Sequence, residues 1–446
     1  MKIVIAGAGD MGTHLAKMLS GNGHDLTVVD VDPKALVEVG NLVDVVTVEG
    51  DTTQFSVLRK SGVRRCDLFI AVRSVENDNI LSAVMAKQLG AKKAIARVDS
   101  SEYLEPNSKE VFIDMGIDYL FYPEQIAARE VINLLGHTSS TEYVDFAAGK
   151  LSMVAFRLEL TSPLLGRTVI DPEYNDEDLE YRIVAIVRGS KTIIPNRDER
   201  FEEEDMVYAI TRHNATHRVV ELSGRREVEI RNMMILGGSR IGVRIANELQ
   251  DDVNIKLVDY DADKAFRLAE MLDKTLIINE DGRDTEAMME EDLSGMDAFV
   301  AVTGRSETNI LAAMLAKRMG VKKVIAEVEN INYISLAESI GVDTIINKKL
   351  VTASNIFRFT MTTEVQTIKC LTGSQAEVME FIVKPNSPAT KERIRDLGLP
   401  EESIIGGVVR GDRVFIAVDD TQINAYDRVV VFAMPEAVMS VAEFFN

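Results

Sequence analysis

The sequence predicts an α/β protein with two tandem doubly wound parallel sheets, each followed by a small strand-rich α+β lobe. Three observations lead to this expectation: a long internal repeat, an alternation of short apolar segments with amphipathic ones, and a glycine-rich turn at the start of each half. A chain of 446 residues is also longer than one ordinary domain, so several domains are expected.

The repeat is clearest between residues 67–98 and 297–328. Sixteen of these 32 positions are identical without a gap, at an offset of 230 residues, and they include Asn79 and Asn309. The same offset pairs Gly7 with Gly237. Repeats of about 20–50 residues would indicate a solenoid, so this much longer unit indicates a duplicated domain.

Each half begins with short apolar segments that alternate with segments of helical periodicity. This alternation is typical of a parallel sheet covered by helices. In the first half the predicted strands are KIVIAGAG, HDLTVVDVD, DVVTVEGD, DLFIAV and KKAIARV, and the predicted helices are MGTHLAKMLSGNG, SVLRKSGV and NDNILSAVMAKQLG. The second half repeats this order from NMMILGGS to KKVIAEV.

A smaller module follows each parallel sheet. YRIVAIVRGSKTIIP and MVYAITR predict strands with a turn at 188–190, and SIIGGVVRGDRVFIAV and DRVVVFAM repeat this pattern with a turn at 410–412. We therefore expect parallel-sheet lobes at residues 1–125 and 230–350, and small lobes at 126–226 and 351–446.

Composition excludes several classes of protein. The chain has 50 Lys and Arg against 71 Asp and Glu, a formal charge of −21, so a nucleic-acid partner is not expected. Two distant cysteines, Cys66 and Cys370, support neither a disulfide framework nor a zinc site, and no metal site is expected. No signal peptide and no apolar stretch of about 18 residues is apparent, which predicts a cytoplasmic protein.

The first glycine-rich turn has the pattern of a Rossmann-like dinucleotide site. Gly7-Ala8-Gly9-Asp10-Met11-Gly12 follows a predicted strand and opens a predicted helix. In such a turn the glycines permit the bend, the approach of a pyrophosphate and close packing of the helix, whose N-terminus attracts phosphate. Asp30 ends the second strand, where an acid binds both ribose hydroxyls and disfavours the 2′-phosphate of NADP. NAD(H) is therefore the expected ligand of this site.

Other residues of the first half lie at predicted carboxyl ends of strands, where open parallel sheets bind ligands. Asp51 and Thr52 follow the third strand, and Arg97 ends the fifth. Asp51 would face the ribose or adenine, or would only cap its own loop. Arg97 would contact a phosphate.

The second half carries a modified turn, Gly237-Gly238-Ser239-Arg240-Ile241-Gly242, followed by Asp259 and Asp281. Ser239 replaces the middle glycine, and Arg240 replaces Asp10. Arg240 would reach terminal phosphates, which favours NAD(H) or ATP/ADP here, or it would form a structural ion pair. A degenerate copy without ligand is the alternative for the whole site.

Catalysis is not expected. A dehydrogenase needs a group such as His, Lys, Tyr or Cys beside its nicotinamide. The five histidines, which are His14, His24, His137, His213 and His217, have no counterparts at matching positions of the repeat. The alternative to a regulatory protein is an NAD-dependent oxidoreductase, including one similar to saccharopine dehydrogenase, and hydride transfer would distinguish them.

The chain resembles the TrkA family, the regulatory subunits of Trk-type potassium uptake systems, which contain tandem RCK domains. The segments that carry the resemblance are AAMLAKRMGVKKV, GDTT at Gly50, SIIGGVVRGD at Ser403 and IVAIVRGSKTIIP at Ile183. The resemblance implies control by NAD(H) or by ATP and ADP, a tetrameric or dimer-of-dimers assembly, and attachment to a membrane-embedded potassium-translocating subunit. A nucleotide sensor that partners a different transporter is a further alternative.

The resemblance also implies two sets of nucleotide-binding residues. Ser239 and Glu327, where the family pattern has glycine and arginine, are departures in the second set. The first set is Gly7 to Met11, Asp30, Asp51, Thr52, Arg73, Ser74 and Arg97, and the second is Gly237 to Ile241, Asp259, Asp281, Thr303 and Gly304.

Overall fold

The computed structural model describes residues 1–21, 23–169, 180–189, 191–195, 198–225, 227–360, 365–371, 374 and 376–446. Ser190, in the first predicted turn of the small lobes, lies outside these residues. The chain forms two compact units. Unit 1 is Met1–Ile126 with Thr352–Thr360, and unit 2 is Ala127–Val351 with Met361–Asn446.

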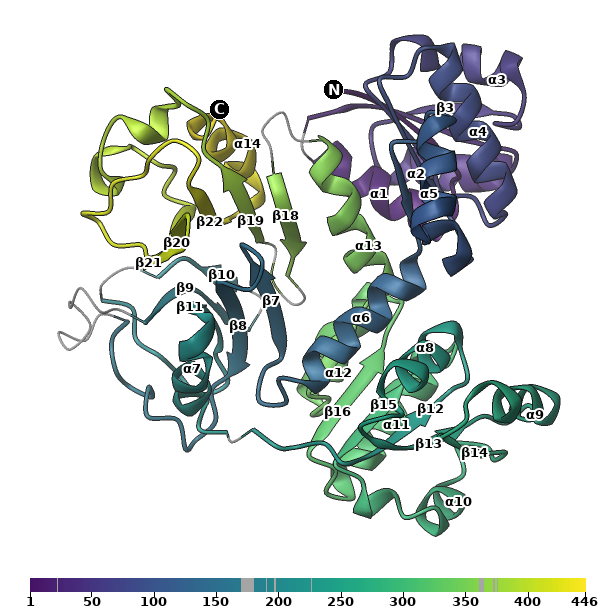
Figure 1. Ribbon diagram of the computed structural model, residues 1–446, viewed down its shortest axis with the longest axis vertical. Helices are drawn as coiled ribbons and strands as arrows, with labels where there is room; N and C mark the ends of the chain where they lie inside the picture. The colour runs from purple at the N-terminus through teal and green to yellow at the C-terminus, as the bar shows by residue number, and fades with distance from the viewer. Residues whose placement is uncertain are drawn as a thin grey trace. The chain divides into compact units, whose positions relative to one another are not determined.

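Unit 1 contains the first parallel sheet (Figure 1, purple to blue). The sheet has six parallel strands in the order β3-β2-β1-β4-β5-β6, which is the doubly wound order that the sequence predicts. Its strands are β1 (Lys2–Ala6), β2 (Asp25–Asp30), β3 (Val46–Glu49), β4 (Leu68–Ala71), β5 (Lys93–Arg97) and β6 (Tyr119–Phe121). Its helices are α1 (Asp10–Ser20), α2 (Pro33–Leu42), α3 (Phe55–Lys60), α4 (Glu76–Leu89), α5 (Pro106–Asp114) and the first residues of α6 (Pro123–Leu135).

The strand order of this sheet reverses between β1 and β4. Ile3 in β1 pairs with Leu26 in β2 on one side and with Leu68 in β4 on the other. The connections that leave β1 and β4 therefore separate at the carboxyl edge of the sheet, and such a switch point forms a crevice for ligands.

Unit 2 contains the second parallel sheet, which repeats the first in the order β14-β13-β12-β15-β16-β17. In both sheets the sixth strand has only three residues, too few for its periodicity to be recognised in the sequence. The strands are β12 (Asn232–Leu236), β13 (Asn254–Val258), β14 (Leu276–Ile278), β15 (Ala298–Ala301), β16 (Lys323–Glu327) and β17 (Thr344–Ile346). The helices are α8 (Arg240–Leu249), α9 (Ala262–Met271), α10 (Thr285–Glu290), α11 (Ser306–Arg318), α12 (Ile334–Ser339) and the first residues of α13 (Lys348–Phe357).

The two small lobes are five-stranded antiparallel sheets in unit 2, each with one helix. The first has the order β10-β9-β11-β8-β7, with β7 (Glu142–Phe146), β8 (Leu151–Arg157), β9 (Tyr181–Arg188), β10 (Lys191–Ile193), β11 (Met206–Arg212) and α7 (Thr216–Ser223). The second has the order β18-β19-β22-β20-β21, with β18 (Val365–Cys370), β19 (Glu377–Ile382), β20 (Ser403–Arg410), β21 (Arg413–Ile416), β22 (Arg428–Ala433) and α14 (Pro435–Phe444).

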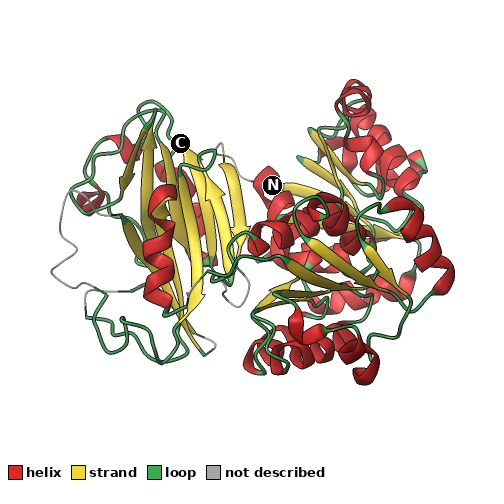
Figure 2. Ribbon diagram, turned by 60° about the horizontal axis from the view of Figure 1, so that its bottom comes forward, coloured by secondary structure: helices red, strands yellow, loops and turns green. Residues whose placement is uncertain are grey.

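The sheets of the two small lobes pack face to face (Figure 2). Tyr208 of the first sheet and Phe432 of the second belong to one buried apolar cluster. The sheets approach closely at Gly406, where an added Cβ would lie 2.4 Å from Cγ1 of Ile210. The sequence predicts each small sheet but not this pairing, which buries one face of both.

None of the helices in the described residues is long and apolar enough to cross a membrane.

Candidate nucleotide-binding sites

In the first half, the chain turns sharply between β1 and α1. Gly7 has a φ of +120°, which favours glycine, and its N–H donates to the carbonyl of Val29 at 2.8 Å. A Cβ on Gly12 would lie 1.9 Å from the carbonyl oxygen of Gly7. These two glycines are therefore required by the packing of the chain itself.

Gly9 is different, because its surroundings within the chain are open. Apart from Gly9 itself and its two neighbours in the chain, no described residue has an atom within 4 Å of the position that a Cβ would take. Gly9 is also the N-cap of α1, and among the described residues no side chain caps this helix. The N–H groups of the first helical turn are thus available to an anion, and the space beside Gly9 suits the pyrophosphate of a dinucleotide.

Asp30 lies beside this turn, as predicted. Its Oδ2 accepts the N–H of Ala8 at 2.6 Å, and its Oδ1 accepts the N–H of Asp32 at 2.9 Å. Two backbone donors fix the orientation of the carboxylate, and its remaining lone pairs can accept ribose hydroxyls. Met11 is buried in α1, whereas Asp10 is exposed.

The structure also brings Asp51 and Arg73 together. Nη1 of Arg73 lies 2.9 Å from Oδ1 of Asp51, and the N–H of Thr53 donates to the same oxygen at 3.0 Å. The Thr53 N–H and the Arg73 guanidinium lower the pKa of Asp51. Thr52 is buried, and its hydroxyl has no hydrogen-bond partner within the described residues, which is the kind of polar group that a ligand would satisfy.

Arg97 and Ser74 lie at the ends of neighbouring strands. Nη2 of Arg97 lies 2.8 Å from Oδ1 of Asp99 and 3.9 Å from Oε1 of Glu124, so this cation faces two carboxylates of its own unit. Ser74 follows β4 and is exposed. The predicted residues therefore lie along the carboxyl edge of one sheet, at the ends of β1 to β5.

The second half repeats the turn between β12 and α8 with one substitution. Gly237 has a φ of +109°, and a Cβ on Gly242 would lie 2.2 Å from the carbonyl oxygen of Gly237. Ser239 takes the place of Gly9, and its Oγ accepts the N–H of Gly242 at 3.3 Å, which caps α8. One first-turn N–H that is available in the first site is thus satisfied by the protein here. Ile241 is buried, whereas Arg240 is exposed.

The acid of the second site is buried and paired with a lysine. Asp259 is 4% exposed, and its Oδ2 accepts the N–H of Gly238 at 2.8 Å and the ammonium of Lys264 at 2.6 Å. Burial raises the pKa of Asp259, but the Lys264 ammonium and the N–H groups of Asp261 and Gly238 outweigh it, so the net shift is downward. Lys264 was not among the residues that the sequence singled out.

Asp281 is held by another cation. The guanidinium of Arg283 binds it in bidentate fashion, with Nη2 to Oδ2 at 2.6 Å and Nε to Oδ1 at 2.9 Å. The Arg283 side chain and N–H lower the pKa of Asp281 to about 2. Two further residues lie where β16 and β15 end. Glu327, at the end of β16, is buried with a carboxylate oxygen 3.7 Å from the ammonium of Lys348, and Gly304, which follows β15, is exposed.

Four matches with models of known domains cover most of the chain. The TrkA-N domain matches residues 3–123 and 233–348, and the TrkA-C domain matches residues 153–224 and 378–446. The TrkA-N matches alone cover more than half of the chain. The chain belongs to the TrkA family.

Relatives of similar length support this membership. The Trk system potassium uptake protein TrkA of Vibrio alginolyticus is 31% identical, over 99% of this chain and 98% of that protein. The TrkA homolog of Archaeoglobus fulgidus is 32% identical, over 100% of both chains.

Solved structures show the same fold. The GsuK RCK domain has a TM-score of 0.61 at 17% identity, covering 100% of this chain and 94% of that one. The GsuK channel bound to NAD has a TM-score of 0.61 at 17% identity, covering 100% of this chain and 78% of that one. The tandem RCK architecture that the sequence predicts is therefore confirmed as a fold.

Both TrkA-N regions contain a buried asparagine whose role sequence reasoning did not find. Asn309 matches Asn79, and its side chain accepts the N–H of Thr303 at 2.9 Å and donates to the carbonyls of Thr303 at 3.0 Å and Glu327 at 2.8 Å. The presence of an asparagine at this position in both copies of the repeat could have indicated the role from the sequence. The amide of this asparagine links the segment that follows the fourth strand of the sheet to the end of the fifth strand.

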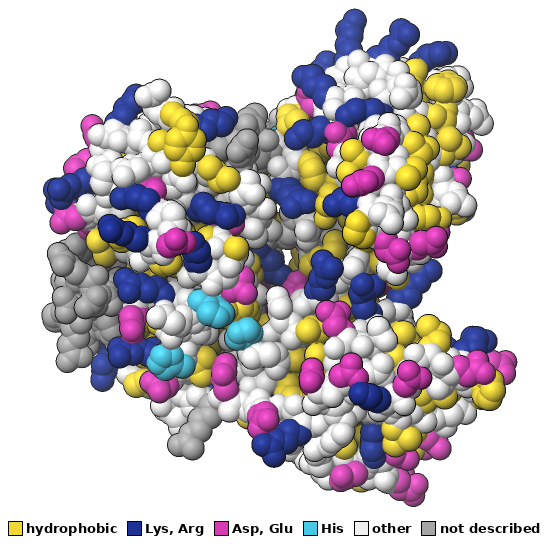
Figure 3. Space-filling model, viewed as in Figure 1, with side chains coloured by type: hydrophobic (Ala, Val, Ile, Leu, Met, Phe, Trp, Pro, Cys, Tyr) yellow, Lys and Arg dark blue, Asp and Glu magenta, His cyan; other side chains and the backbone are white. Residues whose placement is uncertain are grey.

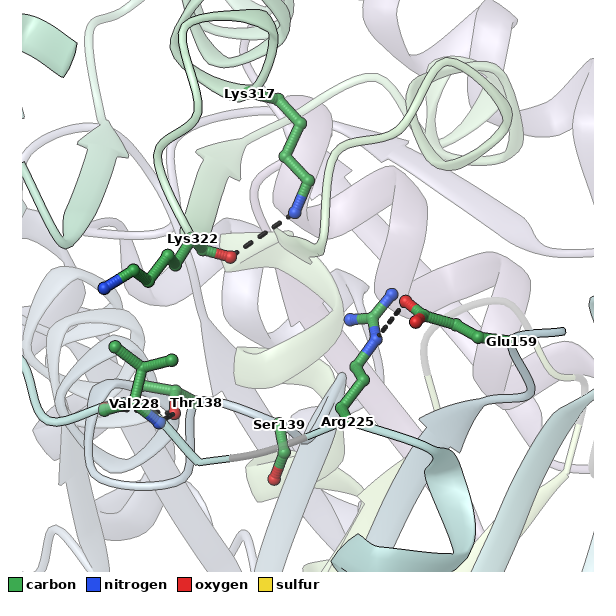
Figure 4. Close-up of a pocket in the computed structure, with 7 residues that line it drawn as sticks. All are labelled: Thr138, Ser139, Glu159, Arg225, Val228, Lys317 and Lys322. Carbon is green, nitrogen blue, oxygen red and sulfur yellow. Dashed lines mark hydrogen bonds and ion pairs between the residues drawn. The ribbon is translucent and has the colours of Figure 1, made fainter. Parts of the chain in front are cut away.

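A cavity of about 260 Å³ lies in unit 2, and its lining includes no residue of either glycine turn (Figure 4). Its cations are paired with carboxylates: Nε of Arg225 lies 2.7 Å from Glu159, and the ammonium of Lys317 lies 2.7 Å from Asp343. The lining residues are Thr138, Ser139, Glu159, Arg225, Val228, Lys317 and Lys322. In the part of the chain that is described, no group of three side chains suits a metal ion.

Proposed function

We propose that this chain is a nucleotide-controlled regulatory subunit of a Trk-type potassium uptake system and works on the cytoplasmic face of the membrane. The observation that carries the proposal is the first turn, where Asp30 is fixed 2.6 Å from the N–H of Ala8 beside the open space at Gly9. Membership of the TrkA family supplies the transport context.

The proposed ligand of the first site is NAD(H). The space at Gly9 and the hydroxyl-accepting carboxylate of Asp30 suit the pyrophosphate and ribose of a dinucleotide. Asp10, in the turn, disfavours the additional charge of a triphosphate. For the second site, where Arg240 replaces Asp10, the proposal is NAD(H) or ATP/ADP. GsuK, which shares the fold, has been solved bound to NAD and bound to ADP.

The proposed action is regulatory and not catalytic. A ligand that binds one arrangement of the lobes more tightly than another shifts their equilibrium by its differential affinity, and the membrane partner responds to that shift. An oxidoreductase is the second candidate class. It would require a proton-transferring group beside the nicotinamide, and production or consumption of NADH with a substrate would reveal it.

We propose four lobes with the limits 1–125, 126–226, 230–350 and 351–446. The two matches to the TrkA-N domain fall inside the first and third, and the two matches to the TrkA-C domain fall inside the second and fourth. The first and third lobes would bind nucleotide.

We also propose a homo-oligomer, a tetramer or a dimer of dimers, which binds a membrane-embedded potassium-translocating subunit. None of the nine residues of α5 is buried. Val111 and Ile113 in α5 and Met115 directly after it are apolar and 41–56% exposed. Leu81 in α4 and its counterpart Leu311 in α11 are 49% and 60% exposed. Figure 3 shows hydrophobic side chains on the surface of unit 1, over the region of α3 and α4. Apolar surface of this kind, repeated in both halves, is typical of an interface between protein chains.

The decisive experiment is calorimetric titration of the full chain with NADH, NAD, ATP and ADP, in wild type and in Asp30→Ala. Loss of a charge-assisted hydrogen bond of about 1.5–3 kcal/mol should weaken binding at the first site by at least tenfold. The substitution Asp259→Ala, added to both the wild type and Asp30→Ala, disables the second site, so that the titration reports on the first site alone. Unchanged affinity in Asp30→Ala, or the absence of binding by any of the four nucleotides, would overturn the proposal.

The partner is tested separately. Co-purification from membranes should recover a potassium-translocating subunit, and nucleotide should change potassium flux through the reconstituted pair. Recovery of a different transporter would retain the nucleotide-sensing role and reject the potassium assignment.

A further inference from the structure

The two candidate sites differ in where they place positive charge, although the chain around them is duplicated. On the adenosine side of the sheet, two short segments of the halves correspond: Asp30 matches Asp259 at an offset of 229 residues, and Asp51 matches Asp281 at an offset of 230 residues. In these segments the first site has Lys34, Ala35 and Thr53, and the second has Asp263, Lys264 and Arg283. The lysine is thus moved by one position, and an arginine replaces a threonine.

Lys264 acts directly on the ribose-binding acid. It is the third residue of α9, and the N-cap Asp261 fixes the start of this helix by accepting the N–H of Lys264 at 3.0 Å. From there its ammonium reaches Oδ2 of Asp259 at 2.6 Å. Asp30 instead accepts the backbone N–H groups of Ala8 and Asp32, and Ala35 occupies the position that matches Lys264. The negative charge that opposes a ribose phosphate in the first site is therefore neutralised in the second.

Arg283 provides a second cation at the same edge. Its N–H donates to Oδ1 of Asp281 at 3.0 Å, which repeats the bond from Thr53 to Asp51, and its guanidinium then folds back onto the same carboxylate. The bidentate pair orients a side chain that is still 62% exposed. The hydrogen bond to Asp281 and the charge of that carboxylate raise the pKa of Arg283.

We propose that the second site selects an adenine nucleotide with a phosphate on its adenosine ribose, of the NADP(H) class, and that Lys264 and Arg283 determine this specificity. The inference rests on the proposed nucleotide-binding function and replaces NAD(H) or ATP/ADP as the ligand of its second site. Lysine and arginine are the side chains that bind phosphate as a point charge and as a planar fork. An arginine near the ribose acid is also how dinucleotide sites of this fold accept a 2′-phosphate.

The position of these cations distinguishes a ribose phosphate from a terminal phosphate. The phosphate chain of a nucleotide lies over the N-terminus of the helix that follows the glycine turn, which here is α8. Lys264 and Arg283 instead follow β13 and β14, at the adenosine end of the carboxyl edge. Arg240 is the first residue of α8, so it lies at the helix end that would face the phosphate chain, whereas Lys264 and Arg283 follow other strands.

The test uses the full chain with the first site closed by Gly9→Val. The Cβ of this valine would lie in the open space beside the turn, more than 4 Å from the described residues other than its chain neighbours, so the fold should survive. In this background, calorimetry should give NADPH an affinity at least tenfold above that of NADH. Adenosine 2′,5′-bisphosphate and its 3′,5′ isomer identify which ribose oxygen carries the preferred phosphate.

The specificity residues are then exchanged for their counterparts in the first half, Lys264→Ala with Arg283→Thr. The preference for NADPH over NADH should then fall below threefold. A parent chain that binds NADPH no better than NADH, or not at all, overturns the inference, and so does a preference that survives the exchange.

A companion variant separates this result from the proposed function. Asp259→Ala with Gly9 intact reports on the first site, which should prefer NADH. Failure of every nucleotide to bind there would reject the proposed function itself, whereas NADH binding there with no preference in the second site would reject only this inference. Circular dichroism and the melting temperature verify that each variant is folded.

Discussion

The side chain of Asn79 binds the backbone of Arg73 in both directions. Its Oδ1 accepts the Arg73 N–H at 2.8 Å, and its Nδ2 donates to the Arg73 carbonyl at 2.9 Å. The same Nδ2 reaches the carbonyl of Arg97 at 3.1 Å. Because Asn79 is fully buried, one amide ties together the segments that follow β4 and end β5. Both arginines of the first candidate site depend on it for their position.

Asn79→Ala should therefore lower stability and weaken nucleotide binding together. Removal of the amide leaves a buried N–H without a partner, which costs about 1–3 kcal/mol in unfolding free energy. Urea unfolding measures that cost, and calorimetry with NADH measures the loss of affinity. Asn309→Ala is the matched control, since it should cost similar stability and leave the first site intact. Equal NADH affinity in wild type and Asn79→Ala would contradict the positioning role.

The glycines of the first turn should respond in opposite ways to the same substitution. Gly12→Ala forces a Cβ to within 1.9 Å of the Gly7 carbonyl oxygen, and overpacking of this kind costs about 1–3 kcal/mol or more. Gly9→Ala places its Cβ more than 4 Å from the described residues other than its chain neighbours, and it should leave the melting temperature nearly unchanged while it weakens NADH binding. Differential scanning calorimetry with NADH titration compares the two. A loss of stability in Gly9→Ala equal to that in Gly12→Ala would show that both glycines serve packing alone.

The sequence was sufficient to predict both parallel sheets and the position of both acids. Strand, glycine turn, helix and acid are neighbours along the chain, so their spacing alone determines that Asp30 and Asp259 lie beside the turns. Lys264 could not be predicted in this way, because its ammonium reaches Asp259 only once Asp261 has fixed the first turn of α9. The role of Asn309 likewise depends on a contact between the ends of β15 and β16, which lie far apart in sequence.

The face-to-face packing of the two small lobes also could not be predicted from the sequence. It depends on Gly406 in β20, which matches Val184 of β9 in the other small lobe, and on the close approach that this substitution permits. A periodic pattern predicts which face of a strand is apolar but does not identify the surface that covers it.

Gly406→Val should therefore separate or distort the paired sheets. The new Cβ would lie 2.4 Å from Cγ1 of Ile210 and 3.1 Å from Cγ1 of Val184, so the side chains that fill this interface must move. We expect a loss of about 1–3 kcal/mol in unfolding free energy, the usual cost of overpacking a core. The double variant Gly406→Val with Ile210→Ala should recover part of it. Wild-type stability in the single variant would mean that the two sheets do not pack this tightly in solution.

Glu377 in β19 should make the stability of the protein depend on pH. The residue is 5% exposed, and its Oε2 has no hydrogen-bond partner among the residues described. Burial raises the pKa of this carboxyl from 4.5 to about 7 in the folded state. Between these values the folded protein binds more protons than the unfolded chain, so the contribution of Glu377 is fully present below pH 4.5 and is lost as the pH rises through about 7.

Glu377→Gln stays neutral at every pH and should remove this dependence. The variant should exceed wild type in unfolding free energy by about 1–3 kcal/mol at pH 8, and the difference should shrink toward zero near pH 4.5. Urea unfolding of both proteins at a series of pH values measures the two curves. Glu401→Gln, which removes an exposed charge from the same lobe, controls for the change in net charge and should run parallel to wild type. If the unfolding free energies of wild type and Glu377→Gln changed with pH in parallel, the pKa of the Glu377 carboxyl would not be raised in the folded protein.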